Sequence, residues 1–565
     1  MASTYSGRLE LTWTNKDMRL LAHEDGRYEW VPASDYRVAE TRLLHNVASV
    51  GDVGPDPTRA SDNLLIRGDA LYGLTCLLEL PEFARNYAGK VRLCYIDPPF
   101  NTGQAFEHYD DALEHSVWLT MMRDRLLQVR RLLSENGSVW LHLDDAEVHR
   151  ARCVLDEVFG AGNFIATVIW QKIHARNNSA QHFSTDHDYV LVYAKSKDAW
   201  VRNRIDRTAL SDKEFWNPDD DPRGPWRRSD LTASHAYSEG KYEVTGPDGD
   251  TFKPRENRWW SVSKETFEAL RADDRLWWGR TGTSFPFRKR FQSELLGLVP
   301  TTIWPHDDVG DNREAKSEIT RLFGRDAMFG TPKPERFLHR VMNIASDPGD
   351  IVVDCFLGSG TTAAVAHKLG RRWVGIEWSA DTVATFALPR LTKVVKGQDV
   401  GGVTEAASWS GGGGFRVLDV APSMFEDDEG RVVLAEWATN GALCEATAAQ
   451  LGFDFIEEPP FCGRKGRTRL AVVDGLVGEE AIRVLIGALG VDERAVVCGT
   501  AIDPAARAVL KELRPGSTMR KIPGSILEEY RQHRRAHSQL AQVLDWAEAV
   551  ELMEPGVGIE AANAT

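Results

Sequence analysis

The sequence predicts an α/β fold built on a doubly wound, mostly parallel sheet, with an inserted region and a smaller C-terminal α/β domain. Strand and helix patterns alternate from residue 64 to 194, which is typical of a parallel sheet with right-handed crossovers. The alternation is lost from about 196 to 300, where Gly, Pro, Trp and Arg dominate, and returns from 334 to 377. Strands and helices alternate again beyond residue 431.

Length and composition agree with this organisation. A chain of 565 residues, with 42% hydrophobic and 27% charged residues, is expected to form two or three soluble domains. We find no uncharged apolar run long enough to span a bilayer, and the start lacks the layout of a signal peptide. The seven cysteines form no CxxC pair, so they indicate buried thiols in a reducing cytoplasm and no metal site.

The elements of the first half follow one another closely. Residues 64–69 and 91–96 read as strands around an amphipathic helix over 70–80. A helix over 116–133 comes next, with Ser116 as its N-cap, and then a strand over 138–143. Further strands are predicted at 165–170 and 189–194. One face of the helix over 116–133 carries Trp118, Met122, Leu126, Val129 and Leu133.

The stretch 95-YIDPPFNTG-103 closes the strand over 91–96. Two prolines and a glycine are an ordinary way to end a strand and turn the chain. They do not explain why an acid, Asp97, stands at the end of a buried strand with an aromatic ring, Phe100, held rigidly beside it. In open α/β sheets that edge is where ligands bind.

A second motif lies in 350-DIVVDCFLGSGTTAAVAHKLGRRWVGIE-377. A strand ends at Asp354, a Gly-rich turn follows, a helix begins at Thr361, and the next strand ends at Glu377. Glycines at 358 and 360 permit close approach of a ligand and positive φ. Glu377 is placed to accept hydrogen bonds from two ribose hydroxyls. The arrangement favours a nucleoside cofactor over a packing turn, although the third glycine of the dinucleotide fingerprint is missing.

Together, 97-DPPF-100 and 356-FLGSGTT-362 resemble the amino-group DNA methyltransferases that use S-adenosylmethionine, in the permuted order called the beta arrangement. The blocks 115-HSVWLTMMRDRL-126, 257-NRWWSVSKETFEAL-270, 311-DNREAKSEITRLF-323 and 331-TPKPERFL-338 are similar to modification subunits of type III restriction–modification systems. The resemblance covers roughly residues 60 to 400. It implies a homodimer acting on double-stranded DNA, with a helicase or endonuclease (Res-like) partner, in a bacterial or archaeal cytoplasm.

The resemblance also implies the site. Asp97 and the Pro98 carbonyl would accept the protons of a target amine, Pro99 would keep the segment rigid, and Phe100 would stack on the flipped base. Phe stands where Tyr is commoner, which keeps stacking and loses a hydroxyl. Asp at position 97 favours adenine N6, whereas Ser would suggest cytosine N4. The implied cofactor residues are Asp354, Phe356, Gly358, Gly360, Thr361, Thr362 and Glu377, with Lys333 near the methionine carboxylate and Asp69 on the adenine amine.

His115, Asp144 and Asp145 are interpreted as caps and loop residues.

Two other assignments stay open, that of Asp69 and that of the stretch from 172 to 290. Asp69 is equally well explained as a helix N-cap. The basic and tryptophan-rich stretch from 172 to 290 could bind DNA in spite of the net charge of −15, or form a mixed-charge surface over core tryptophans. Its predicted DNA contacts are Arg227, Arg228, Arg258, Arg288, Lys289 and Arg290.

The expected domains are an N-terminal arm (1–60), the catalytic half (61–195), a target-recognition region (196–300), the cofactor half (301–400), a flexible linker (401–414) and a C-terminal α/β domain for partner or dimer contacts (415–565). A helical tail is predicted over 526–554. The predicted activity is methylation of adenine N6 in a specific DNA sequence. The alternatives are a DNA-recognition subunit with weak or lost catalysis that positions a helicase or nuclease, and an enzyme acting on cytosine N4 or on RNA.

Overall fold

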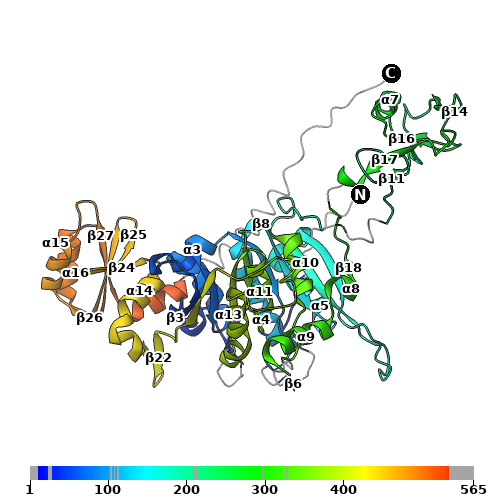
Figure 1. Cartoon of the computed structure of the whole chain (residues 1–565). Coiled ribbons are helices and arrows are strands. Elements are labelled where there is room, and N and C mark those ends of the chain that lie inside the picture. Colours follow the sequence, from blue (N-terminus) through cyan, green and yellow to red (C-terminus); the bar gives the residue numbers. More distant parts are fainter. Residues whose placement is uncertain are drawn as a thin grey trace, which may run out of the picture. The chain divides into compact units, whose positions relative to one another are not determined.

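The computed structural model describes residues 10–22, 28–101, 105–106, 109–110, 114–205, 207, 213–294, 297–325 and 329–532. The chain forms two compact units (Figure 1). The first comprises Met1–Arg202 and Thr301–Thr565, and the second is Asn203–Pro300. The second unit therefore lies within the stretch where the strand–helix alternation of the sequence is lost.

A ten-stranded sheet forms the centre of the first unit, in the order β18–β9–β10–β8–β5–β19–β20–β4–β21–β3. Every neighbouring pair from β8 to β21 is parallel, whereas β10 and β3 run antiparallel to their neighbours. This confirms the predicted mostly parallel α/β fold. The strands are β3 (Leu44–Gly51), β4 (Asn63–Arg67), β5 (Val91–Ile96), β8 (Leu133–Leu143), β9 (Phe164–Gln171), β10 (His187–Ala194), β18 (Ile303–Trp304), β19 (Ile351–Asp354), β20 (Arg372–Glu377) and β21 (Gly414–Val420).

The strand order brings distant parts of the sequence together. β19 and β20 come late in the chain, yet they lie between the early strands β5 and β4. β5 and β19 are buried along their whole length, as expected for apolar strands covered on both faces. The turns that follow β5, β19 and β20 therefore share one edge of the sheet.

Two groups of helices pack on the sheet, with α4 between α2 and α5, and with α11 against α10 and α13. The predicted face of α4 is buried, including Trp118, Met122, Leu126 and Val129. Ser116 is not the N-cap: Glu114 occupies that position and Ser116 lies in the first turn. Up to residue 395, the helices of this unit are α1 (Tyr36–Ala39), α2 (Ala70–Glu79), α3 (Pro81–Tyr87), α4 (His115–Leu132), α5 (Val148–Phe159), α8 (His306–Val309), α9 (Asn312–Phe323), α10 (Glu335–Ala345), α11 (Thr361–Lys368), α12 (Ala380–Thr382) and α13 (Leu388–Val395).

Two predicted boundaries differ from the structure. β3 lies in the expected N-terminal arm and β21 in the expected C-terminal domain, yet both belong to the central sheet. The segment 401–414, predicted to be a flexible linker, is packed. Val403 is buried and its N–H donates to Glu335 Oε2 (2.9 Å), while Trp409 Nε1 donates to the Val394 carbonyl (2.8 Å). Its glycine-rich composition indicated flexibility, but contacts with distant residues hold it.

Small sheets surround a tryptophan-rich core in the second unit. Trp226, Trp277 and Phe291 form one buried cluster, and Trp260 and Trp278 belong to another. These four tryptophans are core residues, which agrees with the mixed-charge-surface interpretation of the stretch. The elements are β11 (Trp226–Ser229), β12 (Thr232–Ala233), β13 (Val244–Thr245), β14 (Thr251–Phe252), β15 (Trp259–Trp260), α7 (Lys264–Ala272), β16 (Leu276–Trp277) and β17 (Phe287–Phe291).

The C-terminal part adds a five-stranded sheet in the order β24–β25–β26–β27–β28, of which the last three strands are parallel. The predicted tail helix (526–554) is helical as far as residue 532, and its remainder, from 533 onward, lies outside the described residues. Among the described helices, none is long and apolar enough to cross a membrane. The remaining elements are β1 (Arg19–Ala22), β2 (Tyr28–Val31), β6 (Ala105–Phe106), β7 (Tyr109–Asp110), β22 (Phe425–Asp428), β23 (Arg431–Leu434), α14 (Leu443–Leu451), β24 (Asp454–Glu458), β25 (Phe461–Lys465), β26 (Thr468–Val477), α15 (Glu479–Gly487), β27 (Arg494–Ile502), α16 (Pro504–Leu513) and β28 (Thr518–Lys521).

Candidate active site

Three acids meet at the carboxyl edge of the central sheet. Asp97 follows β5, Asp354 ends β19 and Glu377 ends β20, and these three strands are adjacent and parallel. Burial raises the pKa of Asp354 to about 7, and the nearby carboxylates of Asp97 and Glu377 add to that rise. The two sequence motifs therefore form one site whose negative charges oppose each other, an arrangement suited to a cationic ligand.

The two oxygens of the Asp97 carboxylate have different surroundings. Oδ2 accepts a hydrogen bond from Lys333 Nζ at 2.6 Å. Oδ1 is buried and has no hydrogen-bond partner among the described residues. A buried carboxylate oxygen without a donor is costly, so it marks a place where a ligand N–H would be stabilised.

Lys333 pairs with a residue that the sequence did not indicate, and its contact with a cofactor stays a prediction. The resemblance implies a contact with the methionine carboxylate of the cofactor, whereas the structure places the Lys333 ammonium on Asp97 and 5.3 Å from the centre of the Phe100 ring. The two residues are 236 positions apart in the chain, so the sequence alone does not indicate that they pair. The Lys333 ammonium engages Oδ2 and leaves Oδ1 as the oxygen to which no described residue donates a hydrogen bond.

The DPPF turn is held at several points. Pro98 is buried, and Trp118 Nε1 donates to the Pro99 carbonyl at 2.7 Å. Asn101 adopts a left-handed conformation (φ 62°), and its Nδ2 donates to Glu147 Oε1 at 2.7 Å. Glu147 also bonds His115, which is the first residue of α4 and not a loop residue. These contacts preorganise the segment that presents Asp97 and Phe100.

A buried histidine that belongs to neither sequence motif supports Phe100 from behind. The His142 ring lies 5.7 Å from the Phe100 ring, between centroids, at a tilt of 31°. Tyr95 Oη is 2.7 Å from His142 Nδ1, and Asp188 Oδ2 is 3.3 Å from His142 Nε2. Burial lowers the pKa of His142, and the charge of Lys333 lowers it further. A neutral His142 that accepts from Tyr95 and donates to Asp188 satisfies all three groups.

The Gly-rich loop closes around Glu377. Gly358 (φ 54°) and Gly360 (φ 82°) both use the left-handed region that glycine favours. The Gly358 N–H donates to Glu377 Oε2 at 2.8 Å, and the Ser379 N–H donates to Oε1 at 3.0 Å. The exposed Trp378, which was not among the predicted site residues, follows Glu377 directly and offers a planar surface beside it.

Two other predicted cofactor residues, Asp354 and Thr361, stabilise the Gly-rich loop through hydrogen bonds. Asp354 accepts hydrogen bonds from the Phe356 N–H (2.9 Å) and from the Thr362 hydroxyl. The Thr361 hydroxyl accepts from Arg390 at 2.7 Å, and Arg390 also donates to the buried Glu335 at 2.9 Å. Thr361 therefore anchors the loop to a buried ion pair. Direct contact of these residues with a cofactor stays a prediction.

For Asp69 the structure shows the capping alternative. Its Oδ1 accepts from the Leu71 N–H at 2.6 Å at the start of α2, and Arg125 donates to both carboxylate oxygens at 2.8 Å. The Arg125 guanidinium also lies 5.8 Å from the centre of the Phe356 ring. Asp69 thus reaches the Gly-rich loop through Arg125.

Two of the predicted DNA contacts are structural in the second unit. Lys289 is buried, and its ammonium lies 2.6 Å from Asp219, 3.0 Å from Asp221 and 3.3 Å from Asp274. The prediction that Lys289 contacts DNA is therefore wrong. Strand alternation could have shown this, because Lys289 shares a face with the half-buried Phe287 and the core residue Phe291. Arg258 donates to Thr232 Oγ1 (2.9 Å) and to the Thr232 carbonyl (2.8 Å), which holds the β12–β15 pair.

Three other arginines share the opposite face of the β11–β17 ribbon. Arg227 stands opposite Arg290, and Arg288 lies two residues along the same strand from Arg290. Arg227 has a partner in Glu214 at 3.1 Å, and Arg290 is exposed. Like charges directly across a ribbon repel each other, so this arginine face favours an anionic partner. Arg228 points to the other face, where its guanidinium lies 5.3 Å from the centre of the Trp216 ring.

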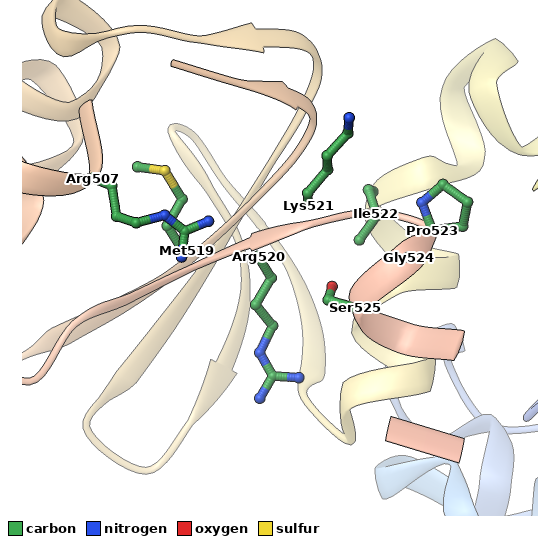
Figure 2. Close-up of a pocket in the computed structure, with 8 residues that line it drawn as sticks. All are labelled: Arg507, Met519, Arg520, Lys521, Ile522, Pro523, Gly524 and Ser525. Atoms are coloured by element: carbon green, nitrogen blue, oxygen red, sulfur yellow. The ribbon is translucent and has the colours of Figure 1, made fainter. Parts of the chain in front are cut away.

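A pocket in the C-terminal part contains no residue of this site. It lies where β28 leads into the following turn and is lined by residues 507 and 519–525 (Figure 2). Arg520 in this pocket is already paired with Glu529.

Residues 91–387 match the family described as DNA methylase. The chain belongs to this DNA methylase family. Its relatives include the Mod subunit of the type III restriction–modification enzyme StyLTI of Salmonella typhimurium, which is 33% identical over 55% of this chain and 50% of that protein. The type II methyltransferase M.EcaI of Enterobacter cloacae is 31% identical over 53% of this chain and 66% of its own length.

Among solved structures, the PvuII DNA methyltransferase (cytosine-N4-specific) covers 60% of this chain and 90% of its own, at 16% identity and a TM-score of 0.33. The chain spans about half the length of its StyLTI relative.

Members of the DNA methylase family use S-adenosyl-L-methionine. The residues at the sheet edge fit this group. Its two cationic groups, a sulfonium and an ammonium, suit the acids at this edge, and its ribose diol suits the Glu377 carboxylate. A Cβ at Gly358 would meet the Phe329 ring at 3.1 Å and one at Gly360 would meet Ala387 at 3.3 Å, so the packing of this loop also requires glycine.

Proposed function

We propose that this chain is a sequence-specific DNA methyltransferase that methylates N6 of an adenine flipped out of duplex DNA. The observation that carries the proposal is the buried Asp97 Oδ1, which lacks a donor while Oδ2 is held by Lys333. The exocyclic amine of adenine is a poor nucleophile because its lone pair is delocalised into the ring. Asp97 Oδ1 and the Pro98 carbonyl can each accept a hydrogen bond from one of its N–H groups and so localise that lone pair. Once the methyl group leaves the sulfonium for this nitrogen, Asp97 can take up the proton that the nitrogen releases.

The surrounding residues position the base and the cofactor. Phe100, supported by His142, would stack on the flipped adenine. Bound S-adenosylmethionine would supply the methyl group. Glu377 would hold its ribose, and the loop containing Phe356, Gly358 and Gly360 would hold the rest. The Asp97 carboxylate becomes hydrogen-bonded to the amine as positive charge develops there, which stabilises the transition state more than the ground state.

We further propose that the chain is the modification subunit of a type III restriction system. Similarity to the StyLTI Mod subunit supports this assignment. A cytoplasmic location, a homodimer and a helicase or endonuclease partner belong to the same proposal. The rival, a recognition subunit that has lost catalysis, is disfavoured by the ordered Asp97–Lys333 pair and the intact Gly-rich loop.

The reaction can be tested directly. We expect single-molecule sequencing of DNA from cells that express the protein to show one methylated motif. Purified protein with tritiated S-adenosylmethionine and that duplex should yield N6-methyladenine on nucleoside analysis. Recovery of N4-methylcytosine would contradict the adenine assignment, and labelled RNA without labelled DNA would contradict the substrate class. No transfer by a protein that binds both DNA and cofactor would favour the recognition-subunit alternative.

The arginine face should govern nonspecific DNA affinity. Replacing Arg227, Arg288 and Arg290 together by Ala should weaken binding to all duplexes. It should also flatten the dependence of log K on log salt by roughly 0.9 for each phosphate that is no longer neutralised. Fluorescence anisotropy over a salt series measures both quantities. Lys264→Ala, an exposed cation on α7 of the same unit, is the matched control and should leave the slope unchanged.

An unchanged slope in the triple variant would show that this face does not contact DNA.

Lys289→Ala should lower the stability of the second unit. It removes the partner of three carboxylates, and loss of one member of a buried ion pair costs about 3–5 kcal/mol. The expected result is a lower midpoint of thermal unfolding.

A further inference from the structure

The loop between β9 and β10, residues 172–186, projects from the catalytic edge of the sheet. β10 is antiparallel to β8, and β8 is parallel to β5, so β10 begins at the edge where β5 ends and Asp97 follows. The connection from β9 to β10 therefore leaves the sheet on the same side as the DPPF turn. A DNA duplex bound at the proposed target site would therefore also lie on the side of the sheet from which the 172–186 loop projects.

The root of this loop is fixed. The N–H groups of Lys172 and Ile173 both donate to the Asp186 carbonyl, at 2.9 and 3.2 Å. The Asn312 N–H donates to the Lys172 carbonyl at 2.9 Å, and the rings of His174 and His306 lie 4.3 Å apart. These contacts hold the two ends of the loop in place, so the residues between them project from the sheet.

The tip carries an aromatic side chain in water. Phe183 is 90% exposed and is the most exposed large aromatic side chain among the described residues. An aromatic ring that packs on nothing loses the favourable free energy that burial would provide. Most residues around it are also exposed, and the loop carries Lys172 and Arg176 with a single acid, Asp186, at its end. A basic loop with an apolar tip is suited to a polyanion that offers an apolar interior.

We propose that Phe183 inserts into the base stack of duplex DNA beside the target adenine and fills the space that the flipped base leaves. Duplex DNA combines phosphates, which Arg176 can contact, with stacked bases that accept an apolar wedge. A flipped base leaves a gap, and closing it with a ring recovers part of the stacking lost. The inference rests on the proposed function, because it requires a base to leave the stack.

The test compares Phe183→Ala with the wild-type protein on two duplexes. In one, the target adenine is paired with thymine, and in the other it stands opposite an abasic site, where flipping needs less assistance. Because replacing a stacking aromatic by Ala typically costs about 5- to 150-fold, we expect a loss in that range in the single-turnover rate on the paired duplex. The loss on the abasic duplex should be much smaller. Phe183→Trp should restore the rate, since an indole can also stack.

A second readout does not depend on methyl transfer. With 2-aminopurine at the target position, flipping by the wild-type protein should raise the fluorescence, and Phe183→Ala should reduce that rise. Val491→Ala is the matched control, because Val491 is equally exposed (91%) but lies in the C-terminal part, and it should match wild type in both assays. Thermal unfolding checks that each variant is folded.

Equal rates for wild type and Phe183→Ala on the paired duplex would overturn the inference. So would an equal loss on both duplexes, because a wedge matters only when the base is stacked and paired. The wild type could also show a larger 2-aminopurine fluorescence rise than Phe183→Ala while neither protein transfers a methyl group. That result would contradict the proposed reaction and still support the insertion of Phe183.

Discussion

Replacing Asp97 by Asn should abolish methyl transfer while leaving S-adenosylmethionine binding nearly unchanged. The amide carbonyl of Asn can still accept from Lys333, as Oδ2 of Asp97 does at 2.6 Å. Its NH₂ group would then occupy the position of Oδ1 and point a donor at the target amine. Loss of a preorganised group of this kind lowers the rate by about 10²–10³-fold. Single-turnover transfer of tritiated methyl groups measures the rate, and calorimetry measures cofactor affinity.

Asp145→Asn is the matched control for this substitution. Asp145 is an exposed acid shortly after β8, the strand next to β5, and no role in the site is assigned to it. It should retain wild-type transfer. Near-wild-type turnover by Asp97→Asn would contradict the proposed chemistry. A large loss of cofactor affinity would move the role of Asp97 from the amine to the cofactor.

Replacing Glu377 by Gln should produce the opposite pattern: S-adenosylmethionine affinity falls and DNA affinity stays unchanged. Both Glu377 oxygens accept backbone N–H groups, from Gly358 and from Ser379. Gln keeps the shape but presents a donor on one side, so one of these N–H groups loses its acceptor and the ribose loses a charged partner. Hydrogen bonds to charged groups contribute about 1.5–3 kcal/mol, which corresponds to a loss of about 10- to 150-fold in affinity.

Calorimetric titration of S-adenosylmethionine into the two proteins measures this loss. Asp381→Asn, an exposed acid four positions further along the chain, should bind the cofactor as the wild type does. Unaltered affinity in Glu377→Gln would remove Glu377 from the ribose role and leave it as a brace for the Gly-rich loop.

Several site residues follow from local pattern. A buried apolar strand that ends in an acid, and a glycine-rich turn before a helix, are features of a few consecutive residues, so Asp97, Asp354, Glu377 and the glycines could be selected directly. Residues whose partners are distant in the chain could not be judged in this way. Lys333 pairs with Asp97, 236 positions away in the chain, and His142 supports Phe100 from a neighbouring strand.

Composition was least informative for segments whose structure depends on contacts with residues distant in the chain. The glycine-rich segment 401–414 looks like a linker, yet the buried Glu335 accepts its Val403 N–H. The basic and aromatic stretch around 226–291 looks uniform, yet alternation along β17 separates the buried Lys289 from the arginines on the other face.

By itself the sequence determined the α/β class, the order of the two motifs and the acids at the strand ends, because hydrophobic periodicity and turn residues act over a few positions. Which of these residues meet depends on the order of the strands in the folded sheet. Strand order places β19 and β20 between β5 and β4, so residues from distant parts of the chain share one edge of the sheet. The pairing of charges then depends on distances of a few ångströms between those strand ends, and sequence spacing does not encode such distances.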